Sequence, residues 1–332
     1  MRISNITSSV RQLLLASLSM LPVAVGSLPA AAATPADTIN IPGEKIFPES
    51  LTSTSDGSVI IGSIAQKTVY RAKPGAATAE VWIAPGTEGL NNVLGVFADN
   101  KAGTLYVCSN VLGPPGAGPA VNATLLTFDS KSGAPKGHYV FPTEKATCND
   151  IAVDADGNAY ATDTSNMEIV TLKKGGTALT VWAGNGAFGP KGGVLDGISV
   201  LGKRVVANTL ATSKLWSIPI GADGKAGPVT EVKLDKEIVR PDGMRSFGKS
   251  DVLIIEGGNG GRLSRISLTG DTGKVTTVKE GYPDGPVAVT VVGTTAYVLE
   301  GQLAAFMGRP AAGTEPPPPK PFKATAVQVG KP

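Results

Sequence analysis

Residues 148–163 read Cys-Asn-Asp-Ile-Ala-Val-Asp-Ala-Asp-Gly-Asn-Ala-Tyr-Ala-Thr-Asp, and this pattern predicts a β-hairpin. An alternating apolar strand is followed by an Asp-Gly turn and by a second apolar strand that ends on Asp163. Asp and Gly tolerate the positive φ angles that tight hairpin turns require. Because polar side chains stand at the start and at the end of this hairpin, it is a candidate for carrying part of a functional site.

The same hairpin occurs six times along the chain. Its second strand ends each time on a polar residue, at Ser63, Ser109, Asp163, Asn208, Glu256 and Glu300. Successive end positions are 46, 54, 45, 48 and 44 residues apart. Two further strand-like runs follow each of the first five hairpins, and a period of roughly 40–50 residues is typical of a four-stranded propeller blade. The sequence therefore predicts an all-β, six-bladed β-propeller. A β-sandwich, the alternative, would not need six matched repeats.

The last blade is incomplete after Glu300, and both chain ends are expected to complete it. We predict that the run 321–329 is its third strand and that residues 38–41 supply its fourth strand. Closure of this kind removes exposed sheet edges, which would otherwise invite aggregation. In blade four, the run 229–234 is predicted to form the outer strand.

Composition and the first residues of the chain indicate class and location. The 332 residues include 42 Gly and 25 Pro, with 5% aromatic and 17% charged residues, as expected for short strands joined by many turns. Residues 1–33 resemble a secretory signal peptide, with Arg2 and Arg11, an apolar run over 13–25 and small residues at 30–33. That run is too short for a membrane anchor, which needs roughly 20 apolar residues. We therefore expect a secreted or periplasmic protein in which residues 34–332 form one propeller domain.

The charge balance narrows the classes of partner. Removing residues 1–33 takes away two Arg and no acid, so the formal net charge falls from +3 to +1. A nucleic-acid-binding domain would be far more basic. We expect a small-molecule substrate, no nucleic acid and no membrane insertion after signal cleavage, and the sequence leaves the oligomeric state open.

Four oxygen-bearing side chains stand at matched positions near the starts of the first strands. In a propeller these strands line the central channel, so the four side chains are expected to form part of a ring: Glu49, Asn149, Asp196 and Asp242. The matching places in blades two and six, near Val93 and Pro286, offer no ligand. Single acids at such positions commonly cap hairpins or solvate the channel mouth. Three carboxylates at one point would instead repel one another unless a cation neutralised them.

The donor set indicates which cation would bind. Hard oxygen ligands favour Ca²⁺, with Mg²⁺ and Mn²⁺ as alternatives. Zn²⁺ fits less well, because the single histidine, His138, falls in an outer fourth strand. We therefore predict a calcium site made by the four first-strand residues.

Two further groups of residues are candidates for specific roles. The polar ends of the second strands are expected to join Asn149 in holding waters or substrate hydroxyls, with structural cross-strand hydrogen bonds as the alternative: Asp163, Asn208, Glu256 and Glu300. Cys108 and Cys148 are expected near the metal-bearing end of neighbouring blades, where a disulfide is predicted. Two buried thiols would remain instead if the strands were too far apart for the roughly 4.4–6.8 Å Cα separation of a disulfide.

At these residues the chain resembles the gluconolactonase and regucalcin (senescence-marker protein) family of six-bladed propellers, which are relatives of the paraoxonases. The resemblance runs from about Phe47 to the end of the chain. It rests on four stretches, which are Phe47-Pro-Glu49, the run 149–157, Leu195-Asp-Gly-Ile and Pro241-Asp242-Gly-Met. The resemblance implies that the matching Glu, an Asn and an Asp bind a divalent cation. It also implies that Asn149 binds metal-bound water or substrate, and that Asp242 acts as general base.

The chain departs from the family pattern in three ways. Asp196 stands where the family usually has Asn, which adds a negative charge to the site. Thr147 stands where sugar-acid lactonases carry an Arg, and this argues against an acidic sugar substrate. The paraoxonase histidine pair is also missing, because the chain has one His.

Two functions compete at this point. The first is a metal-dependent hydrolase of lactones or related esters, of the lactonase or esterase type, in which Asp242 orients or deprotonates the attacking water. No Gly-x-Ser-x-Gly pattern supports an acyl-enzyme route instead. The second is a non-catalytic periplasmic propeller that binds a ligand or protein and uses Ca²⁺ as a structural pin.

Overall fold

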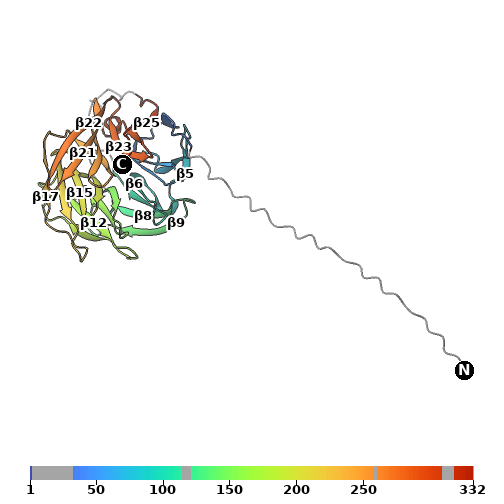
Figure 1. Ribbon diagram of the computed structural model, residues 1–332, viewed down its shortest axis with the longest axis horizontal. Helices are drawn as coiled ribbons and strands as arrows, with labels where there is room; N and C mark the ends of the chain where they lie inside the picture. Colours follow the sequence, from blue (N-terminus) through green and yellow to red (C-terminus); the bar gives the residue numbers. More distant parts are fainter. Residues whose placement is uncertain (2–32, 114–120, 258–259, 309–317, 332) are drawn as a thin grey trace. The chain divides into compact units, whose positions relative to one another are not determined.

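Six β-sheets are arranged around a common centre in the computed structural model (Figure 1). The structure describes residues 1, 33–113, 121–257, 260–308 and 318–331. Almost all of the predicted signal segment, residues 2–32, lies outside these ranges. Residues 33–332 form one compact unit. Each sheet is one blade, so the prediction of a six-bladed β-propeller is confirmed.

The first three blades each contain four strands in chain order. Blade one consists of β2 (Pro48–Ser53), β3 (Val59–Ser63), β4 (Thr68–Ala72) and β5 (Glu80–Ile83). Blade two consists of β6 (Asn92–Asp99), β7 (Thr104–Asn110), β8 (Thr124–Asp129) and β9 (Pro135–Val140). Blade three consists of β10 (Cys148–Val153), β11 (Ala159–Asp163), β12 (Glu168–Leu172) and β13 (Thr180–Ala183). In Figure 1 the first strand β6 lies near the centre and the fourth strands β5 and β9 lie at the rim.

The last three blades vary this plan. Blade four consists of β14 (Leu195–Leu201), β15 (Arg204–Thr209), β16 (Lys214–Pro219) and β17 (Thr230–Glu231). Blade five consists of β19 (Pro241–Phe247), β20 (Asp251–Glu256), β21 (Gly261–Thr269) and β22 (Thr272–Tyr282), with β18 (Lys233–Leu234) at its edge. Blade six consists of β23 (Pro286–Val292), β24 (Thr295–Glu300), β25 (Phe322–Gln328) and β1 (Thr38–Ile41). Two short helices, η1 (Thr87–Gly89) and α1 (Leu303–Met307), lie between strands.

The N-terminal strand closes the ring as predicted. β1 pairs antiparallel with β25, with Thr38 opposite Thr325 and Ile41 opposite Phe322. The N-terminal strand therefore supplies the fourth strand of the blade whose other three strands come from the end of the chain. The interface between blades six and one is buried and apolar, and it includes Ile39, Leu51 and Phe322.

The first hairpin turn of blade three is wider than the sequence suggested. Val153 pairs with Ala159, and Asp154 closes the loop by accepting hydrogen bonds from the amides of Asp156 and Asn158 at its Oδ1, both 2.9 Å long. Gly157 has a φ of 90°, which explains why glycine follows aspartate here. The Asp154 side chain thus supports a backbone β-turn in which the Gly157 amide donates to the Asp154 carbonyl at 3.0 Å.

The prediction of one outer strand over residues 229–234 is wrong. The segment divides at Val232, so that β17 pairs with β16 in blade four and β18 pairs in parallel with β22 in blade five. Val232 is 3% exposed and packs in the apolar cluster between these blades, which includes Leu215 and Ile254. Burial of this side chain between two blades ends one pairing and begins the other.

The inner strands are buried on both faces because each blade packs against two neighbours. All five residues of β3 are buried, whereas the first two residues of β5 at the rim are exposed. This explains the continuous apolar runs in the second strands, such as Val59-Ile-Ile and Val252-Leu-Ile-Ile. Burying one such Ile or Val side chain contributes about 1.5–3 kcal/mol.

Candidate metal centre

A β-bulge lies near the start of the first strand in every blade. In blade three, Cys148 pairs with Asp163 but Ile151 pairs with Ala161, so β10 carries one extra residue. The first strands of the other five blades show the same one-residue shift. A bulge bends the strand and re-aims a side chain. The residues within these bulges include all four predicted first-strand ligands, Glu49, Asn149, Asp196 and Asp242.

Glycines next to the bulges allow neighbouring blades to approach closely. A Cβ on Gly197 would lie 2.4 Å from the carbonyl oxygen of Asp242, and a Cβ on Gly243 would lie 2.8 Å from that of Val287. Both distances are too short for any other residue without movement of the backbone. The dipeptides Asp196-Gly197 and Asp242-Gly243 resemble turn signals in the sequence, but here they lie inside strands and set the spacing of the ring.

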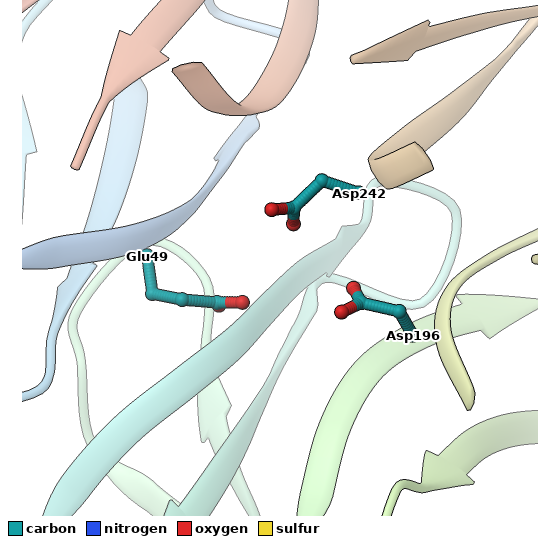
Figure 2. A group of neighbouring side chains, drawn as sticks. All are labelled: Glu49, Asp196 and Asp242. Atoms are coloured by element: carbon teal, nitrogen blue, oxygen red, sulfur yellow. The ribbon is translucent and has the colours of Figure 1, made fainter. Parts of the chain in front are cut away.

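Three of the four first-strand side chains form the carboxylate cluster, which consists of Glu49, Asp196 and Asp242. Each offers one oxygen, and these oxygens all lie within 4.8 Å of one another. Figure 2 shows the three carboxylates pointing toward one another from separate strands. They come from blades one, four and five, and their residues are 7%, 4% and 8% exposed. The bulges of three blades therefore direct three carboxylates to one buried point.

The electrostatics of the carboxylate cluster are unfavourable without a cation. Burial, and then the charges of Asp196 and Asp150, raise the pKa of Glu49 well above its usual value, although Arg245 opposes this rise. Burial and the charge of Asp242 raise the pKa of Asp196, and burial and the charge of Glu49 raise that of Asp242. Three ionised carboxylates at this distance are unstable unless a positive charge compensates them.

The fourth first-strand residue, Asn149, lies beside Asp196. Its Nδ2 donates to Thr164 Oγ1 at 3.0 Å, and its contact with Asp196 opposes the rise in that residue's pKa. Asn149 Oδ1 and Asp196 Oδ1 are buried and have no hydrogen-bond partner among the described residues. Buried acceptors without partners are costly and rare. An oxygen-only donor set of three carboxylates and one amide fits a hard divalent cation.

The polar ends of the second strands have mostly structural partners. Asp163 accepts hydrogen bonds from the amides of Thr147, Ser165 and Asn166. Glu256 forms an ion pair with Arg262 at 2.7 Å, and Glu300 accepts the amide of Asp284 at 2.9 Å. These three carboxylates therefore fix loops and strands of their own blades.

Asn208 is the exception among the second-strand residues. Its Nδ2 donates to the carbonyl oxygen of Asp242 at 2.7 Å, and its Oδ1 is buried with no partner in the described part of the chain. Asn208 therefore contacts the backbone of a cluster residue and holds the bulge of blade five.

Two residues that the sequence analysis did not select form a buried ion pair beside the carboxylate cluster. Arg245 of β19 contacts Asp150 of β10 at 2.8 Å, and the two side chains are 9% and 5% exposed. Arg245 Nη2 also donates to Ser50 Oγ, to the Leu51 carbonyl and to the Val96 carbonyl at 3.3, 3.2 and 3.0 Å. Because these partners belong to blades one, two and three, the guanidinium crosses the channel and joins four blades. The only sequence signal was the acid that follows Asn149.

A disulfide joins Cys108 of β7 to Cys148 of β10, with a Cα–Cα distance of 5.2 Å. Asn110 reinforces this junction, since its Oδ1 accepts the Cys148 amide at 3.0 Å and its Nδ2 donates to the Cys148 carbonyl at 2.9 Å. The residue that follows is Asn149. The junction between blades two and three therefore fixes the backbone of a candidate ligand.

A cavity of about 550 Å³ opens beside Asp242, between blades five and six. We call it the inter-blade cavity. Helix α1 and the loop before β23 form much of its wall. Asp242 belongs to both the carboxylate cluster and the cavity wall, so a molecule in the cavity would reach the cluster at this residue.

Comparisons with known proteins support the fold. No family model matches the chain, and no curated protein matches its sequence. Among solved structures, the major allergen of Malassezia sympodialis matches with a TM-score of 0.65 at 12% identity, over 91% of this chain and 97% of that one. A protein assigned as a gluconolactonase matches with a TM-score of 0.61 at 15% identity, over 91% and 94%. Virginiamycin B lyase from Staphylococcus aureus matches with a TM-score of 0.54 at 13% identity, over 88% and 98%.

The chain shares one propeller fold with these proteins. The predicted resemblance to gluconolactonase-type propellers is thus confirmed at the level of the fold. The three matched proteins are named for different roles, so the chemistry of this propeller has to be argued from its own residues.

Proposed function

We propose that this propeller is a secreted or periplasmic, divalent-metal-dependent hydrolase of lactones or related esters. The observation that carries the proposal is the carboxylate cluster, in which three buried acids converge beside the partnerless oxygen of Asn149. Ca²⁺ is the cation that this oxygen-only donor set favours, with Mg²⁺ and Mn²⁺ as alternatives. Zn²⁺ lacks the nitrogen ligands it prefers. A small molecule in the inter-blade cavity is the expected substrate.

Glu49, Asn149, Asp196 and Asp242 would hold the ion. A bound divalent ion would supply a Lewis acid that polarises the substrate carbonyl. Asp242 has a second role in this proposal, because it alone of the cluster lines the inter-blade cavity. Its Oδ1 accepts the Gly243 amide at 2.9 Å, which leaves Oδ2 to accept a proton from the attacking water. The backbone contact would hold the carboxylate in place for this proton transfer.

The test is a panel of lactones assayed with the purified protein after chelation and after addition of Ca²⁺, Mg²⁺ or Mn²⁺. We expect hydrolysis that disappears with chelator and returns with Ca²⁺, while the folded structure persists by circular dichroism. A Glu49→Gln variant should need more Ca²⁺ for half-maximal rate. Hydrolysis that survives complete removal of metal would contradict the proposal.

The second candidate is a non-catalytic propeller that binds a ligand or protein and uses the ion as a structural pin. It is favoured by the origin of the cluster in three blades, since one ion would then join blades one, four and five. A large loss of thermal stability on chelation, with no turnover of any lactone, would favour this function.

A lyase like the one from Staphylococcus aureus is not favoured. That lyase is catalytically inactive when a particular histidine is replaced by alanine. The only histidine here, His138, is exposed on β9, the outer strand of blade two. No histidine is therefore available at the carboxylate cluster.

A further inference from the structure

The wall of the inter-blade cavity is mainly apolar. Its apolar part comes from just after the end of β15 in blade four, from the loop before β23, from blade six and from α1, and comprises Leu210, Pro283, Pro286, Val287, Leu303, Ala304, Ala305 and Met307. The polar side chains of the wall are Arg240, Asp242, Asp284 and Gln302. A volume of about 550 Å³ is within the range of pockets that take small ligands.

Two of the four polar side chains in this wall already have protein partners. Gln302 Nε2 donates to the Lys320 carbonyl at 3.0 Å, and Gln302 Oε1 accepts the Lys320 amide at 2.9 Å. Asp284 forms an ion pair with Lys320 Nζ at 2.5 Å. Lys320 thus occupies both polar atoms of the Gln302 side chain and Oδ1 of Asp284. Arg240 and Asp242 remain, and both lie at the blade-five side of the cavity.

Helix α1 lines the cavity with apolar side chains, and the helix is held in place by packing against two separate apolar clusters. Leu303 and Phe306 pack against the cluster between blades six and one and also against the cluster of blades two and three. The ring of Phe306 lies 5.2 Å from that of Phe47. The helix therefore contributes an apolar part of the wall that also includes Asp242.

From this wall we infer that the site selects lactones with an apolar body, such as alkyl-substituted lactones, and not polyhydroxylated sugar lactones. This inference rests on the proposed hydrolase function. A sugar lactone would leave several hydroxyl groups without partners in the cavity, which costs affinity for each one. An alkyl chain would instead displace water from Val287, Leu303 and Met307.

The reaction of such a substrate is balanced by water alone. The water oxygen bonds to the carbonyl carbon, and Asp242 accepts one of its protons. The bond between the carbonyl carbon and the ring oxygen breaks, and Asp242 gives its proton to the ring oxygen, which becomes a hydroxyl. The second proton of the attacking water is released to solvent as the new carboxylic acid ionises. The product is a hydroxy acid whose carboxylate forms near Arg240, the one cationic side chain of the wall.

The first experiment compares kcat/KM for γ-decalactone, γ-butyrolactone and glucono-δ-lactone in the Ca²⁺-loaded protein. We expect γ-decalactone to exceed glucono-δ-lactone by at least about tenfold, because the hydrophobic wall discriminates by roughly that factor for one or two methylene groups. A higher value for glucono-δ-lactone would overturn this inference and leave the hydrolase intact. Absence of hydrolysis for every lactone would count against the proposed function.

The second experiment measures binding without turnover. The probe is 2-hexylcyclopentanone, a ketone analogue that cannot be hydrolysed, titrated calorimetrically into the wild type and into Leu303→Ser and Met307→Ser. Each variant should weaken binding by about threefold to tenfold and should lower kcat/KM more for γ-decalactone than for γ-butyrolactone. The matched control is Val140→Ser, an exposed apolar residue on the outer strand β9, which should change neither quantity. Wild-type protein that does not bind the ketone, or binding unchanged in both cavity variants, would overturn the inference.

Discussion

At the residue scale, Asp242 is distinguished from the other two acids by what it contacts. Glu49 and Asp196 belong to the carboxylate cluster alone, whereas Asp242 also lines the inter-blade cavity. Asn208 holds its carbonyl and the Gly243 amide holds its Oδ1, so both ends of the residue are fixed. Such a group is suited to act on a substrate as well as to bind an ion.

Replacing Asp242 by Asn should separate these two roles. The amide keeps one ligand oxygen but removes the charge and the proton acceptor, so Ca²⁺ should bind more weakly and turnover at saturating Ca²⁺ should fall by about 10²–10⁴. Turnover and calorimetric Ca²⁺ titration measure the two effects. The control is Glu300→Gln, because its Oε1 accepts the Asp284 amide away from the cluster. Near-normal turnover of the Asp242→Asn variant would contradict the assignment of Asp242 as the general base.

The raised pKa values of the cluster also predict how stability depends on pH. In the chelated protein the folded state holds its protons on Glu49, Asp196 and Asp242 to higher pH than the unfolded chain does, because burial and mutual repulsion raise each pKa. The folded state therefore binds more protons than the unfolded chain above the usual carboxyl range. The stability that these groups contribute therefore falls as pH rises above the usual carboxyl range.

Ca²⁺ should reverse this dependence, since protons then compete with the ion for the carboxylates. The measurement is the urea midpoint at a series of pH values with chelator and with excess Ca²⁺. Replacing Glu49 by Gln should reduce the pH dependence of the chelated protein. Identical pH profiles with and without Ca²⁺ would show that the ion does not bind the cluster.

At the element scale, the bulge of each first strand is the unit that builds the site. A bulge adds one residue to the strand and re-aims a side chain, and in blades four and five the glycine that follows lets the next blade approach. Gly197 is the tightest case in the cluster, with the Asp242 carbonyl oxygen 2.4 Å from where its Cβ would lie. The spacing between β14 and β19 thus depends on this residue having no side chain.

Gly197→Ala should push β19 away from β14. We expect the free energy of unfolding to fall by about 1–3 kcal/mol, as for other overpacked core sites, and Ca²⁺ affinity to fall because Asp242 moves away from Asp196. Chemical denaturation and Ca²⁺ titration measure the two. Gly221→Ala is the control, since its Cβ would come closest to the exposed side chain of Asp223, which can move, and would lie 3.3 Å from the nearest backbone atom, the Lys225 carbonyl oxygen. If Gly197→Ala changed stability and Ca²⁺ affinity no more than this control, the close approach of Gly197 to the Asp242 carbonyl oxygen would not determine either quantity.

At the scale of the whole molecule, the ring is held together by contacts that cross the channel as well as by packing between neighbouring blades. Apolar clusters fill each blade interface, and β1 closes the ring through β25. Arg245 adds a polar junction that reaches blades one, two and three from blade five. Its partner Asp150 also accepts the Ile198 amide of blade four at 3.3 Å. These two side chains connect five of the six blades.

Breaking this ion pair from one side should destabilise the whole propeller. Arg245→Met leaves Asp150 as a buried charge without its partner, and the expected cost is about 3–5 kcal/mol. The double variant Arg245→Met with Asp150→Asn should cost less than the sum of the single variants, because neither charge remains unpaired. Chemical denaturation of the wild type, the two single variants and the double variant gives the coupling free energy between Arg245 and Asp150. Additive effects would mean that the two residues act independently.

The amino-acid sequence by itself determined the ring, its closure and the positions from which the site is built. Hairpins are encoded locally by apolar runs and by residues such as Asp154 and Gly157, so six copies could be recognised by their spacing. Equivalent positions in repeats occupy equivalent places in a propeller. Counting back from the ends of the second strands therefore selected Glu49, Asp196 and Asp242, which the fold brings together.

Only the tertiary structure decided which polar residues meet across the channel. Arg245 and Asp150 are 95 residues apart and belong to different blades, and no repeat pattern relates them. The same holds for Val232, whose burial between two blades divides a continuous β-prone run. It holds also for Lys320, which occupies Asp284 and Gln302 in the cavity wall. Local periodicity sets where a strand begins and which way its side chains point, but the partner of a long side chain depends on how the blades are packed around the channel.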